Sequence, residues 1–345
     1  MSIMLNEIYE QPEIIPRLAA AEAETAASIA AEIKARDICF GIMAARGTSD
    51  HAAIYGKYLL EIRNGLPVAL ADPSVFTLYG ARMRMDHAVV IGVSQSGQAT
   101  DVAEYLQRSR EAGALTVAVT NVPGSTLTGI ADHTILCHAG EERAVAATKT
   151  YTATLGAMYL LSGTLAGDDA VVDNLTKCAE AMRAALDIED FICHRSQRYR
   201  YMREGYVISR GVNYCTALEM ALKMAETCYV GMKAHSAADF LHGPIAAVHE
   251  DAPCFLIAAP GPALRAMRDT ARLLRERGAE TVVISSDDEI LSLAGTACRF
   301  GVDVDEELSP LVYVIPGQLF AQYLAVDRGY DPDRPRGLAK ITLTR

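Results

Sequence analysis

The chain lacks the features that mark several classes of protein. It has no excess of basic residues: the formal net charge of −11 over 345 residues argues against a nucleic-acid surface or a polybasic membrane contact. Its eight cysteines include no Cys-x-x-Cys pair and no histidine spacing typical of a zinc site. Most of them, such as Cys39 and Cys254, lie in apolar runs and indicate reduced core residues of a cytosolic protein.

Membrane and export signals are also missing. Residues 1–13 contain acidic side chains and no hydrophobic signal core. The longest nearly apolar stretch, residues 153–166, is too short to span a bilayer and is interrupted by small polar side chains. We therefore expect a cytoplasmic protein with no membrane or nucleic-acid partner, and no motif indicates a metal or a redox cofactor.

The chain does have length, apolar residues and an internal repeat. Its 345 residues suggest two domains, and a hydrophobic content of 50% supplies a sizeable core. An apolar segment at 38–43 meets Arg-Gly-Thr-Ser, and another at 206–209 meets Arg-Gly-Val-Asn. Each copy continues with a helix, a second apolar segment and a helix that ends in Arg-Glu-x-Gly-Ala. Because these landmarks recur at nearly the same offset, we infer that one unit occurs twice.

The alternation of strands and helices predicts an α/β fold made of two tandem domains. Each domain is expected to be a parallel sheet flanked by helices, a flavodoxin-like or Rossmann-like three-layer arrangement with right-handed crossovers. The predicted strands are 38–43, 88–93 and 115–120 in the first copy, and 206–209, 253–258 and 281–285 in the second. The predicted segments are a helical lead-in at 1–35 with its helix from Pro16, domains at 36–170 and 201–330, a helical linker at 171–200 and an extended tail at 331–345.

One turn in the first copy has the composition of an anion site. Residues 92–101, Gly-Val-Ser-Gln-Ser-Gly-Gln-Ala-Thr-Asp, follow a buried strand and precede a helix predicted over 101–112. The free amides and the dipole of a helix start favour an anion, and the hydroxyls of Ser94, Ser96 and Thr100 add donors. The alternative is an ordinary turn in which a serine caps the helix.

The second copy differs at the equivalent place. It has Ala-Pro-Gly-Pro at 259–262, and proline supplies no amide donor. We therefore expect a single phosphate site per chain, in the first copy.

Three charged residues share one face of a predicted helix. Glu219, Lys223 and Glu226 have the spacing i, i+4, i+7, and the residues between them are apolar. One interpretation is a solvent-facing Glu–Lys pair worth about 0.2–0.5 kcal/mol. The other is a carboxylate and an amine that face a cleft and transfer protons.

Three further places are candidates, and the first two have two interpretations each. His242 precedes Gly-Pro in a turn, where a histidine either caps local backbone or has a functional role. Residues 141–150 are charged, then small, then polar, which fits either backbone contact with a ligand or the acidic first turn of a long helix. Lys340 is a lysine in the tail, where a solvated side chain is expected, and the sequence chemistry alone indicates no role for it.

Taken together, the motifs resemble the sugar isomerase (SIS) family. The resemblance covers nearly the whole chain and is strongest to members that act on amino sugar phosphates: the isomerase half of glucosamine-6-phosphate synthase, and glucosamine-6-phosphate deaminases of the SIS type. The motifs that carry it are Arg-Gly-Thr-Ser at 46–49, Ser-Gln-Ser-Gly at 94–97, Asn-Val-Pro-Gly-Ser at 121–125, Ala-Ala-Thr-Lys at 146–149, Ala-Leu-Glu to Lys at 217–223, His-Gly-Pro at 242–244 and Pro-Arg-Gly-Leu-Ala-Lys at 335–340. The phrases at 49–52, 73–75 and 139–142 look more like the deaminase branch.

The resemblance implies a role for each candidate residue. The implied catalytic residues are Glu226, which moves a proton between C1 and C2, Lys223, which steadies the developing charge, and Glu219 beside it. His242 is implied to open the sugar ring from the partner subunit of a homodimer with a shared active site. Lys340 is implied to contact the open-chain sugar and to form a Schiff base with a ketose. The implied substrate-binding residues are Ser49, Ser94, Gln95 and Ser96 at the phosphate, with Thr100, Val145, Ala146 and Ala339.

Three departures from the synthase pattern accompany the resemblance. Ala99 stands where the synthases have Thr, and Thr100 next to it lies about 100° around a helix. Arg46 replaces a Cys of the synthases. The matched region begins almost at Met1, so we expect no glutaminase domain and no dedicated source of ammonia.

These features favour glucosamine-6-phosphate deaminase activity on a small-molecule sugar phosphate, with fructose 6-phosphate and ammonia as products. The alternatives are another phosphosugar isomerase, a fructosamine-phosphate deglycase, or a non-catalytic protein that senses sugar phosphates. A sensor has no need of Glu226 with Lys223.

Overall fold

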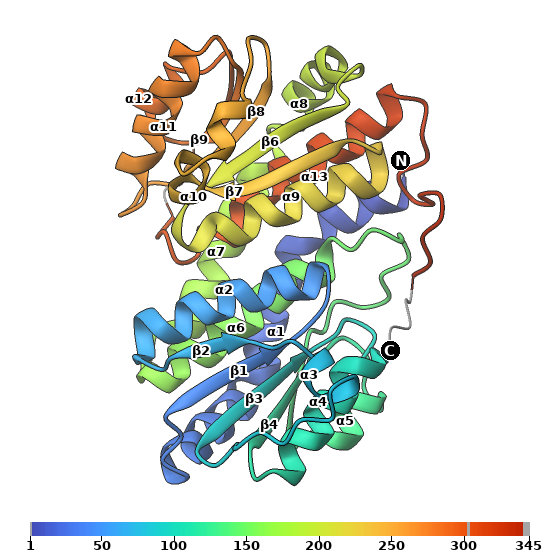
Figure 1. Cartoon of the computed structure of the whole chain (residues 1–345), viewed down its shortest axis with the longest axis vertical. Helices are drawn as coiled ribbons and strands as arrows, with labels where there is room; N and C mark the ends of the chain where they lie inside the picture. Colours follow the sequence, from blue (N-terminus) through green and yellow to red (C-terminus); the bar gives the residue numbers. More distant parts are fainter. Residues whose placement is uncertain (1, 302–303, 341–345) are drawn as a thin grey trace. The chain divides into compact units, whose positions relative to one another are not determined.

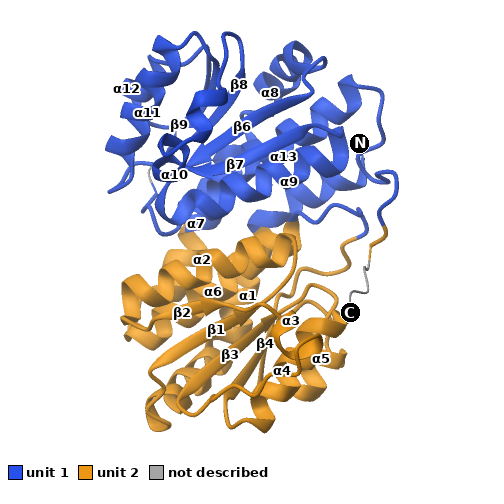
Figure 2. Cartoon of the chain, in the orientation of Figure 1, with its two compact units in different colours: residues 1–12, 143–148, 178–338 blue, residues 13–142, 149–177, 339–345 orange. Residues whose placement is uncertain are grey.

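The computed structural model describes residues 2–301 and 304–340. It divides the chain into two compact units, each assembled from separate stretches of sequence (Figure 2). Unit 1 comprises Met1–Pro12, Arg143–Thr148 and Cys178–Leu338, and unit 2 comprises Glu13–Glu142, Lys149–Lys177 and Ala339–Arg345. Two helices, α1 (Ile3–Ala35) and α7 (Val171–Leu186), contribute residues to both units.

Unit 2 contains five parallel strands in the order β2-β1-β3-β4-β5 (Figure 1). The two central strands β3 and β4 are runs of apolar or β-branched residues, and every residue in them is buried, as expected of a sheet covered on both faces. Helices α3, α4 and α5 pack on one face, while α2 and α6 pack together on the other. The bounds are β1 (Phe40–Ala44), α2 (Thr48–Asn64), β2 (Val68–Leu70), α3 (Ser74–Thr77), β3 (Ala88–Val93), α4 (Thr100–Glu111), β4 (Leu115–Thr120), α5 (Thr126–Ile130), β5 (His133–Leu136) and α6 (Lys149–Ala166).

Unit 1 repeats this arrangement. Its five parallel strands have the order β7-β6-β8-β9-β10, the same topology as in unit 2. Helices α10, α11 and α12 cover one face, and α9 and α13 pack together on the other, where Phe255 of β8 meets Phe320 of α13. The bounds are α8 (Glu189–Ser196), η1 (Gln197–Tyr199), β6 (Glu204–Ser209), η2 (Gly211–Asn213), α9 (Tyr214–Cys228), β7 (Gly231–Ser236), α10 (Ala237–Leu241), η3 (Pro244–Ala247), β8 (Pro253–Ile257), α11 (Leu264–Glu276), β9 (Glu280–Ser285), α12 (Asp288–Leu291), β10 (Thr296–Arg299) and α13 (Ser309–Asp327).

The predicted fold class is confirmed: two copies of a parallel sheet flanked by helices. The strands that the sequence analysis did not predict are β2, β5, β7 and β10, the outermost strands of the two sheets. These edge strands are short or partly exposed, so none of them is a continuous buried apolar run.

Two local predictions are wrong. The first helix begins at Ile3 rather than at Pro16, because the carboxylate of Asp333 accepts hydrogen bonds from the amides of Ile3 and Met4, at 2.8 and 2.7 Å, and caps the helix far upstream of both prolines. Cys39 is exposed rather than in the core, since it precedes β1 at the rim of the sheet. Cys254 is buried as predicted, and all eight cysteines are free.

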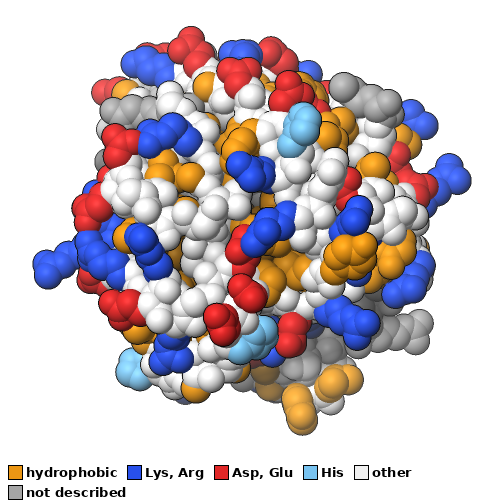
Figure 3. All heavy atoms as spheres, turned by 90° about the horizontal axis from the view of Figure 1, so that it is seen from above, with side chains coloured by type: hydrophobic (Ala, Val, Ile, Leu, Met, Phe, Trp, Pro, Cys, Tyr) orange, Lys and Arg blue, Asp and Glu red, His pale blue; other side chains and the backbone are white. Residues whose placement is uncertain are grey.

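The exterior agrees with the charge balance of the sequence. On the face shown in Figure 3, acidic and basic side chains are interspersed rather than gathered by sign. Within residues 2–301 and 304–340, no helix has both the length and the apolar character needed to cross a membrane.

Candidate functional site

The order of the strands in unit 2 creates a natural ligand position. Strand β1 lies between β2 and β3, and β3 lies between β1 and β4, so the chain leaves β1 and β3 in opposite directions. In open α/β sheets, ligands bind at the carboxyl ends of the two strands where the order reverses. Two loops meet that description: Ala45–Gly47 after β1, and Ser94–Ala99 after β3.

The loop after β3 has the conformation of an anion-binding turn. The amide of Ser94 donates to the carbonyl of Val119 at 3.1 Å, and the amide of Gly97 donates to the carbonyl of Ser94 at 3.1 Å. Gly97 has a positive φ of 63°, and a Cβ there would lie 2.0 Å from the Oγ of Ser125, so no larger residue fits.

The start of α4 is not capped by its own N-cap residue. That residue is Ala99, which has an extended backbone and makes no side-chain capping bond. The alternative of an ordinary turn in which serine caps the helix therefore does not describe this loop. A helix start whose N-cap residue makes no side-chain bond, with hydroxyl groups nearby, is suited to bind an anion.

The other predicted phosphate contacts lie on the same edge of unit 2. Ser49 is in the first turn of α2, directly after the loop that follows β1, and its amide donates to the carbonyl of Arg46 at 3.1 Å. Thr100 is the first residue of α4 and is exposed. Gln95 and Ser96 are partly exposed in the loop itself.

The equivalent helix start in unit 1 is occupied by a side chain of the same unit. The carboxylate of Glu306 accepts a hydrogen bond from the amide of Ala263 at 3.2 Å, just before α11. A Cβ on Gly261 would lie 2.7 Å from the Glu306 side chain, so this carboxylate sits directly against the Pro-Gly-Pro turn. This arrangement supports the prediction of one phosphate site per chain.

Helix α9 in unit 1 carries a buried cluster of charges. The Nζ of Lys223 lies 2.6 Å from an Oε of Glu226 and 3.3 Å from an Oε of Glu219. The side chains of Lys223 and Glu219 are 1% and 0% exposed, whereas that of Glu226 is 22% exposed. The interpretation as a solvent-facing pair is therefore wrong for this helix.

The electrostatics of this cluster fix the charge on the lysine. Burial by itself lowers the pKa of the Lys223 ammonium, but the carboxylates of Glu219 and Glu226 outweigh it and hold that pKa above its ordinary value. Lys223 is therefore a fixed cation beside a carboxylate that solvent reaches. Such a pair can remove a proton from a carbon and stabilise the negative charge that results.

His242 lies elsewhere in unit 1, at the C-terminal end of α10. Its amide donates to the carbonyl of Asp239 at 3.1 Å, and its side chain is exposed. The ring is thus presented at the surface and is accessible to another molecule.

A buried acid holds a backbone segment of unit 1 that contains predicted site residues. The carboxylate of Glu7 accepts hydrogen bonds from the amides of Arg143 and Ala144, at 2.5 and 3.3 Å. The amide of the next residue, Val145, donates to the carbonyl of Asp333 at 3.3 Å. This fixes the backbone on which the resemblance places sugar contacts, at Val145 and Ala146.

The tail is ordered as far as residue 340. In unit 1 the amide of Arg336 donates to the hydroxyl of Tyr229 at 2.8 Å, and the Arg336 guanidinium lies 4.0 Å from the centre of the same ring. Tyr229 ends α9 with a left-handed backbone and packs edge-on against Tyr330. The tail segment is therefore tied to the end of the helix that carries Lys223.

The last described residues, Ala339 and Lys340, belong to unit 2. The Nζ of Lys340 lies 3.1 Å from an Oε of Glu142, whose side chain is fully buried. Glu142 also accepts hydrogen bonds from the amide and hydroxyl of Thr150, at 3.1 and 2.6 Å. Lys340 is therefore not a solvated tail lysine. Residues 141–148 precede α6 as a loop, so the interpretation of 141–150 as a helical first turn is also wrong.

Sequence reasoning missed the acids that organise these segments. Glu7, Asp101, Glu142 and Asp333 each accept backbone or cationic donors distant in sequence. Asp101 and Glu142 lay in stretches that the sequence marked as unusual, 92–101 and 141–150, but neither acid was given a role there. Nothing in the local pattern distinguishes Glu7 and Asp333 from solvated acids.

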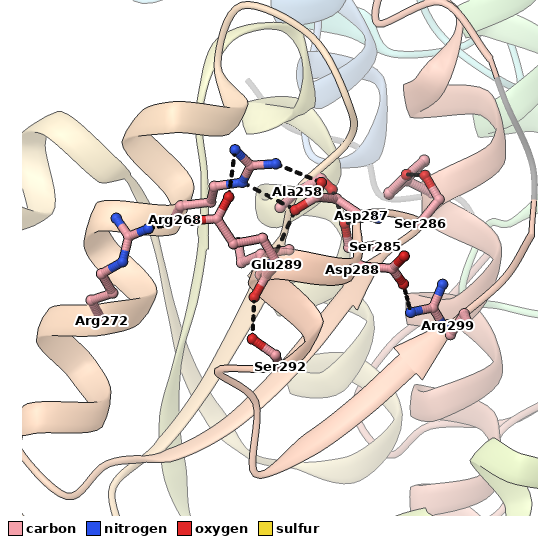
Figure 4. A network of polar contacts seen from close by, with 12 residues as sticks. Ala258, Arg268, Arg272, Ser285, Ser286, Asp287, Asp288, Glu289, Ser292 and Arg299 are labelled. Carbon is pink, nitrogen blue, oxygen red and sulfur yellow. Dashed lines mark hydrogen bonds and ion pairs between the residues drawn. The ribbon is translucent and has the colours of Figure 1, made fainter.

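Another dense charge cluster, around Arg268, has a structural explanation. Its guanidinium makes two hydrogen bonds to Asp287, at 3.1 and 2.6 Å, and an ion pair with Glu289 at 2.8 Å (Figure 4). Asp287 also caps α12 by accepting from the amide of Ile290. Within the described ranges, no group of three or more His, Cys, Asp or Glu side chains is placed to hold a metal ion.

Comparison with known proteins agrees with the two-copy fold described above. The SIS domain model matches residues 33–162 and 203–328. The isomerizing glutamine–fructose-6-phosphate aminotransferase of Methanothermobacter thermautotrophicus is 36% identical over 340 residues, which is 98% of this chain and 56% of that protein. The enzyme of the same name from Thermococcus kodakarensis is 36% identical over 347 residues, 98% of this chain and 57% of that protein. The chain thus spans little more than half the length of these curated relatives.

Solved structures show the same fold along the whole chain. A candidate phosphosugar isomerase from Silicibacter pomeroyi DSS-3 is 33% identical, with a TM-score of 0.87 over 96% of this chain and 100% of that chain. A glucosamine-6-phosphate deaminase from Thermotoga maritima shares the fold, with a TM-score of 0.80, 18% identity and coverage of 99% and 100%. With two matched copies and relatives above 30% identity, the chain belongs to the SIS-domain family.

Proposed function

We propose that this chain is a phosphosugar isomerase that converts glucosamine 6-phosphate and water into fructose 6-phosphate and ammonia. The observation that carries the proposal is the Glu219–Lys223–Glu226 cluster of α9, in which a buried cation touches a carboxylate that solvent reaches. Isomerisation of an aldose needs one group that removes the C2 proton and returns it at C1, and a cation that stabilises the enediol-type charge between the two steps.

The phosphate of the substrate is assigned to the edge of unit 2. Ser94 and Ser96, with Gln95 between them, lie in the loop directly before α4, whose N-cap residue makes no side-chain capping bond. Ser49 and Thr100 add hydroxyl groups from the first turns of α2 and α4. The backbone at Val145 and Ala146, and Ala339 in the tail, are assigned to the sugar.

The proton transfer is assigned to Glu226. It takes the proton from C2 of the open-chain sugar, and the electron pair moves toward the C1 oxygen, where Lys223 steadies the charge. Glu226 then returns the proton to C1 while a proton passes from the C2 amine to the C1 oxygen, which leaves a hydroxyl at C1 and an imine at C2. Water adds to that carbon and ammonia leaves, so the product has a carbonyl at C2.

Two residues complete the assignment. His242 assists ring opening, and we assign it to the active site of a partner subunit in a homodimer, since its exposed ring is accessible to another molecule. Lys340 contacts the open-chain sugar and can form a Schiff base with the ketose. Glu142 positions it through the ion pair at 3.1 Å.

A second candidate is isomerisation of another phosphosugar without release of ammonia. The similarity to the Silicibacter pomeroyi protein, described as a candidate phosphosugar isomerase, favours it. The two are separated by incubating the purified chain with glucosamine 6-phosphate, a fructosamine phosphate and glucose 6-phosphate, each in a separate reaction. Ammonia and fructose 6-phosphate in equal amounts from the first substrate alone support deamination. Aldose–ketose conversion of glucose 6-phosphate without ammonia from any substrate supports the second candidate, and no turnover at all supports a sugar-phosphate sensor.

A further inference from the structure

We propose that Arg46 is a phosphate-binding residue, held by Asp101 beside the serine loop that follows β3. This inference rests on the proposed function and deepens it, because it names a further group that recognises the phosphate of the substrate.

The register of the sheet brings Arg46 to the loop. Strands β1 and β3 are neighbours and parallel, with Ala44 paired to Gly92. Arg46 follows Ala44 by two residues, and Ser94 follows Gly92 by two residues, so both leave the sheet at the same level. Adjacent strands lie about 4.8 Å apart. An arginine side chain spans that distance easily and reaches the ligand position at the ends of the two strands.

An ion pair fixes where the guanidinium lies. The Nε of Arg46 is 2.7 Å from one oxygen of Asp101, and the other oxygen of Asp101 accepts the amide of Val102 at 2.9 Å. Asp101 is buried, with 3% of its side chain exposed, and it sits in the first turn of α4. The guanidinium is therefore held beside the helix start whose amides favour an anion.

The ion pair leaves donors for a ligand. It is made by Nε, and the two terminal nitrogens of a guanidinium carry four further N–H groups in a rigid fork. Half of the Arg46 side chain is exposed, at 50%, so a bound molecule can reach it. A phosphate group accepts hydrogen bonds in the geometry that such a fork offers.

Because Asp101 is negatively charged, Arg46 affects phosphate binding in a second way. A carboxylate in the first turn of α4 repels a phosphate that carries a charge of about −1.5 to −2 at neutral pH. Arg46 neutralises that carboxylate and adds donors of its own. The two effects predict different results when both residues are changed, so they can be separated by experiment.

The first measurement is the affinity for fructose 6-phosphate and for inorganic phosphate by titration calorimetry. Arg46→Ala is expected to weaken both by about 10- to 100-fold, the usual effect of losing hydrogen bonds to a charged group. Arg46→Lys keeps the charge without the fork and is expected to fall between wild type and Arg46→Ala. The matched control is Arg110→Ala, because Arg110 is an equally exposed arginine at the other end of α4 with an ion pair of 2.9 Å to Asp132. Its affinity is expected to stay at the wild-type value.

The second measurement is a double-mutant cycle with Asp101→Asn. If Arg46 contacts phosphate, Arg46→Ala/Asp101→Asn stays at least about tenfold weaker than Asp101→Asn alone. If the double variant instead matches Asp101→Asn, Arg46 only neutralises Asp101 and the proposal is overturned. Circular dichroism checks that each variant is folded, and Arg46→Lys carries the test if Arg46→Ala is not.

The proposed function and the assignment of Arg46 are overturned by different results. If the wild-type chain binds neither fructose 6-phosphate nor glucosamine 6-phosphate, the proposed function fails. If the wild-type chain binds them and both Arg46 variants bind equally well, only the assignment of Arg46 fails.

Discussion

Glu219 and Glu226 flank Lys223, and changing each of them to glutamine is predicted to have different effects on stability and on turnover. Glu219 is fully buried, whereas 22% of the Glu226 side chain is exposed. Breaking a buried ion pair costs about 3–5 kcal/mol, because the remaining charge has no solvent to compensate it. Glu219→Gln leaves Lys223 one carboxylate and a neutral amide oxygen, so we expect a loss near the lower end of that range, about 3 kcal/mol. Water can replace part of the lost contact at Glu226, and Glu226→Gln is expected to cost about 1 kcal/mol.

The effect on turnover is predicted to have the opposite order. Glu226→Gln removes the group assigned to proton transfer, so kcat is expected to fall by at least about 10²-fold. Glu219 acts through Lys223 as a positioning residue, and Glu219→Gln is expected to lower kcat less than Glu226→Gln does. Affinity for fructose 6-phosphate is expected to stay nearly unchanged in Glu226→Gln, because its phosphate contacts remain.

Urea denaturation followed by circular dichroism measures the first effect, and a coupled ammonia assay measures the second. The matched control for stability is Asp269→Asn, which breaks an exposed ion pair with Arg272 of 2.8 Å in the same unit and is expected to cost less than about 0.5 kcal/mol. Wild-type turnover in Glu226→Gln would remove it from the mechanism. Wild-type stability in Glu219→Gln would show that the buried cluster does not hold α9 together.

Three other predictions test separate parts of the account. Deletion of residues 337–345 is expected to abolish turnover of glucosamine 6-phosphate while the far-ultraviolet spectrum is retained, because it removes Lys340 and its ion pair with Glu142; full activity of the truncated chain would show that the tail has no catalytic role. Mixed His242→Asn and Glu226→Gln variants, each inactive alone, are expected to regain part of the activity if subunits share a site, and continued inactivity after confirmed subunit exchange would count against sharing. The hydrogen bonds from Arg268 lower the pKa of the Asp287 carboxyl from its ordinary value of 3.8. The ionised carboxyl therefore stabilises the fold above pH 3.8, and this stabilisation is lost as the pH falls through the lowered pKa. Asp287→Asn is expected to reduce this acid-dependent loss in urea titrations repeated at decreasing pH, and an unchanged pH profile would contradict the assignment.

The central strands could be predicted from the sequence, and the outer ones could not. Every residue of β3 and β4 is buried, so the sequence there is an unbroken run of apolar or β-branched residues with a clear signal. Strand β7 carries Lys233 and His235 and is only partly buried, because an edge strand has one neighbour and one open side. Its pairing is decided by the sheet it joins rather than by its own composition.

Parts of the candidate site could likewise be predicted from the sequence, and other parts could not. The spacing of Glu219, Lys223 and Glu226 was enough to place them on one face of α9, but the helix itself does not reveal whether that face is solvated or buried. The packing of the folded unit decides it, and in the structure the side chains of Glu219 and Lys223 are buried. The partner of Lys340 is 198 residues away, at Glu142, so no local pattern links the two. The serine loop was predictable because its strand, turn and helix are contiguous.

The identity of the product from glucosamine 6-phosphate, measured together with ammonia, tests the central claim most directly. Proton transfer from C2 to C1 by Glu226 predicts that the wild-type chain releases ammonia and fructose 6-phosphate in equal amounts, and that Glu226→Gln binds the sugar phosphate but forms neither. Release of ammonia with a product that keeps its hydrogen at C2, such as glucose 6-phosphate, would contradict the account, and so would wild-type formation of fructose 6-phosphate by Glu226→Gln.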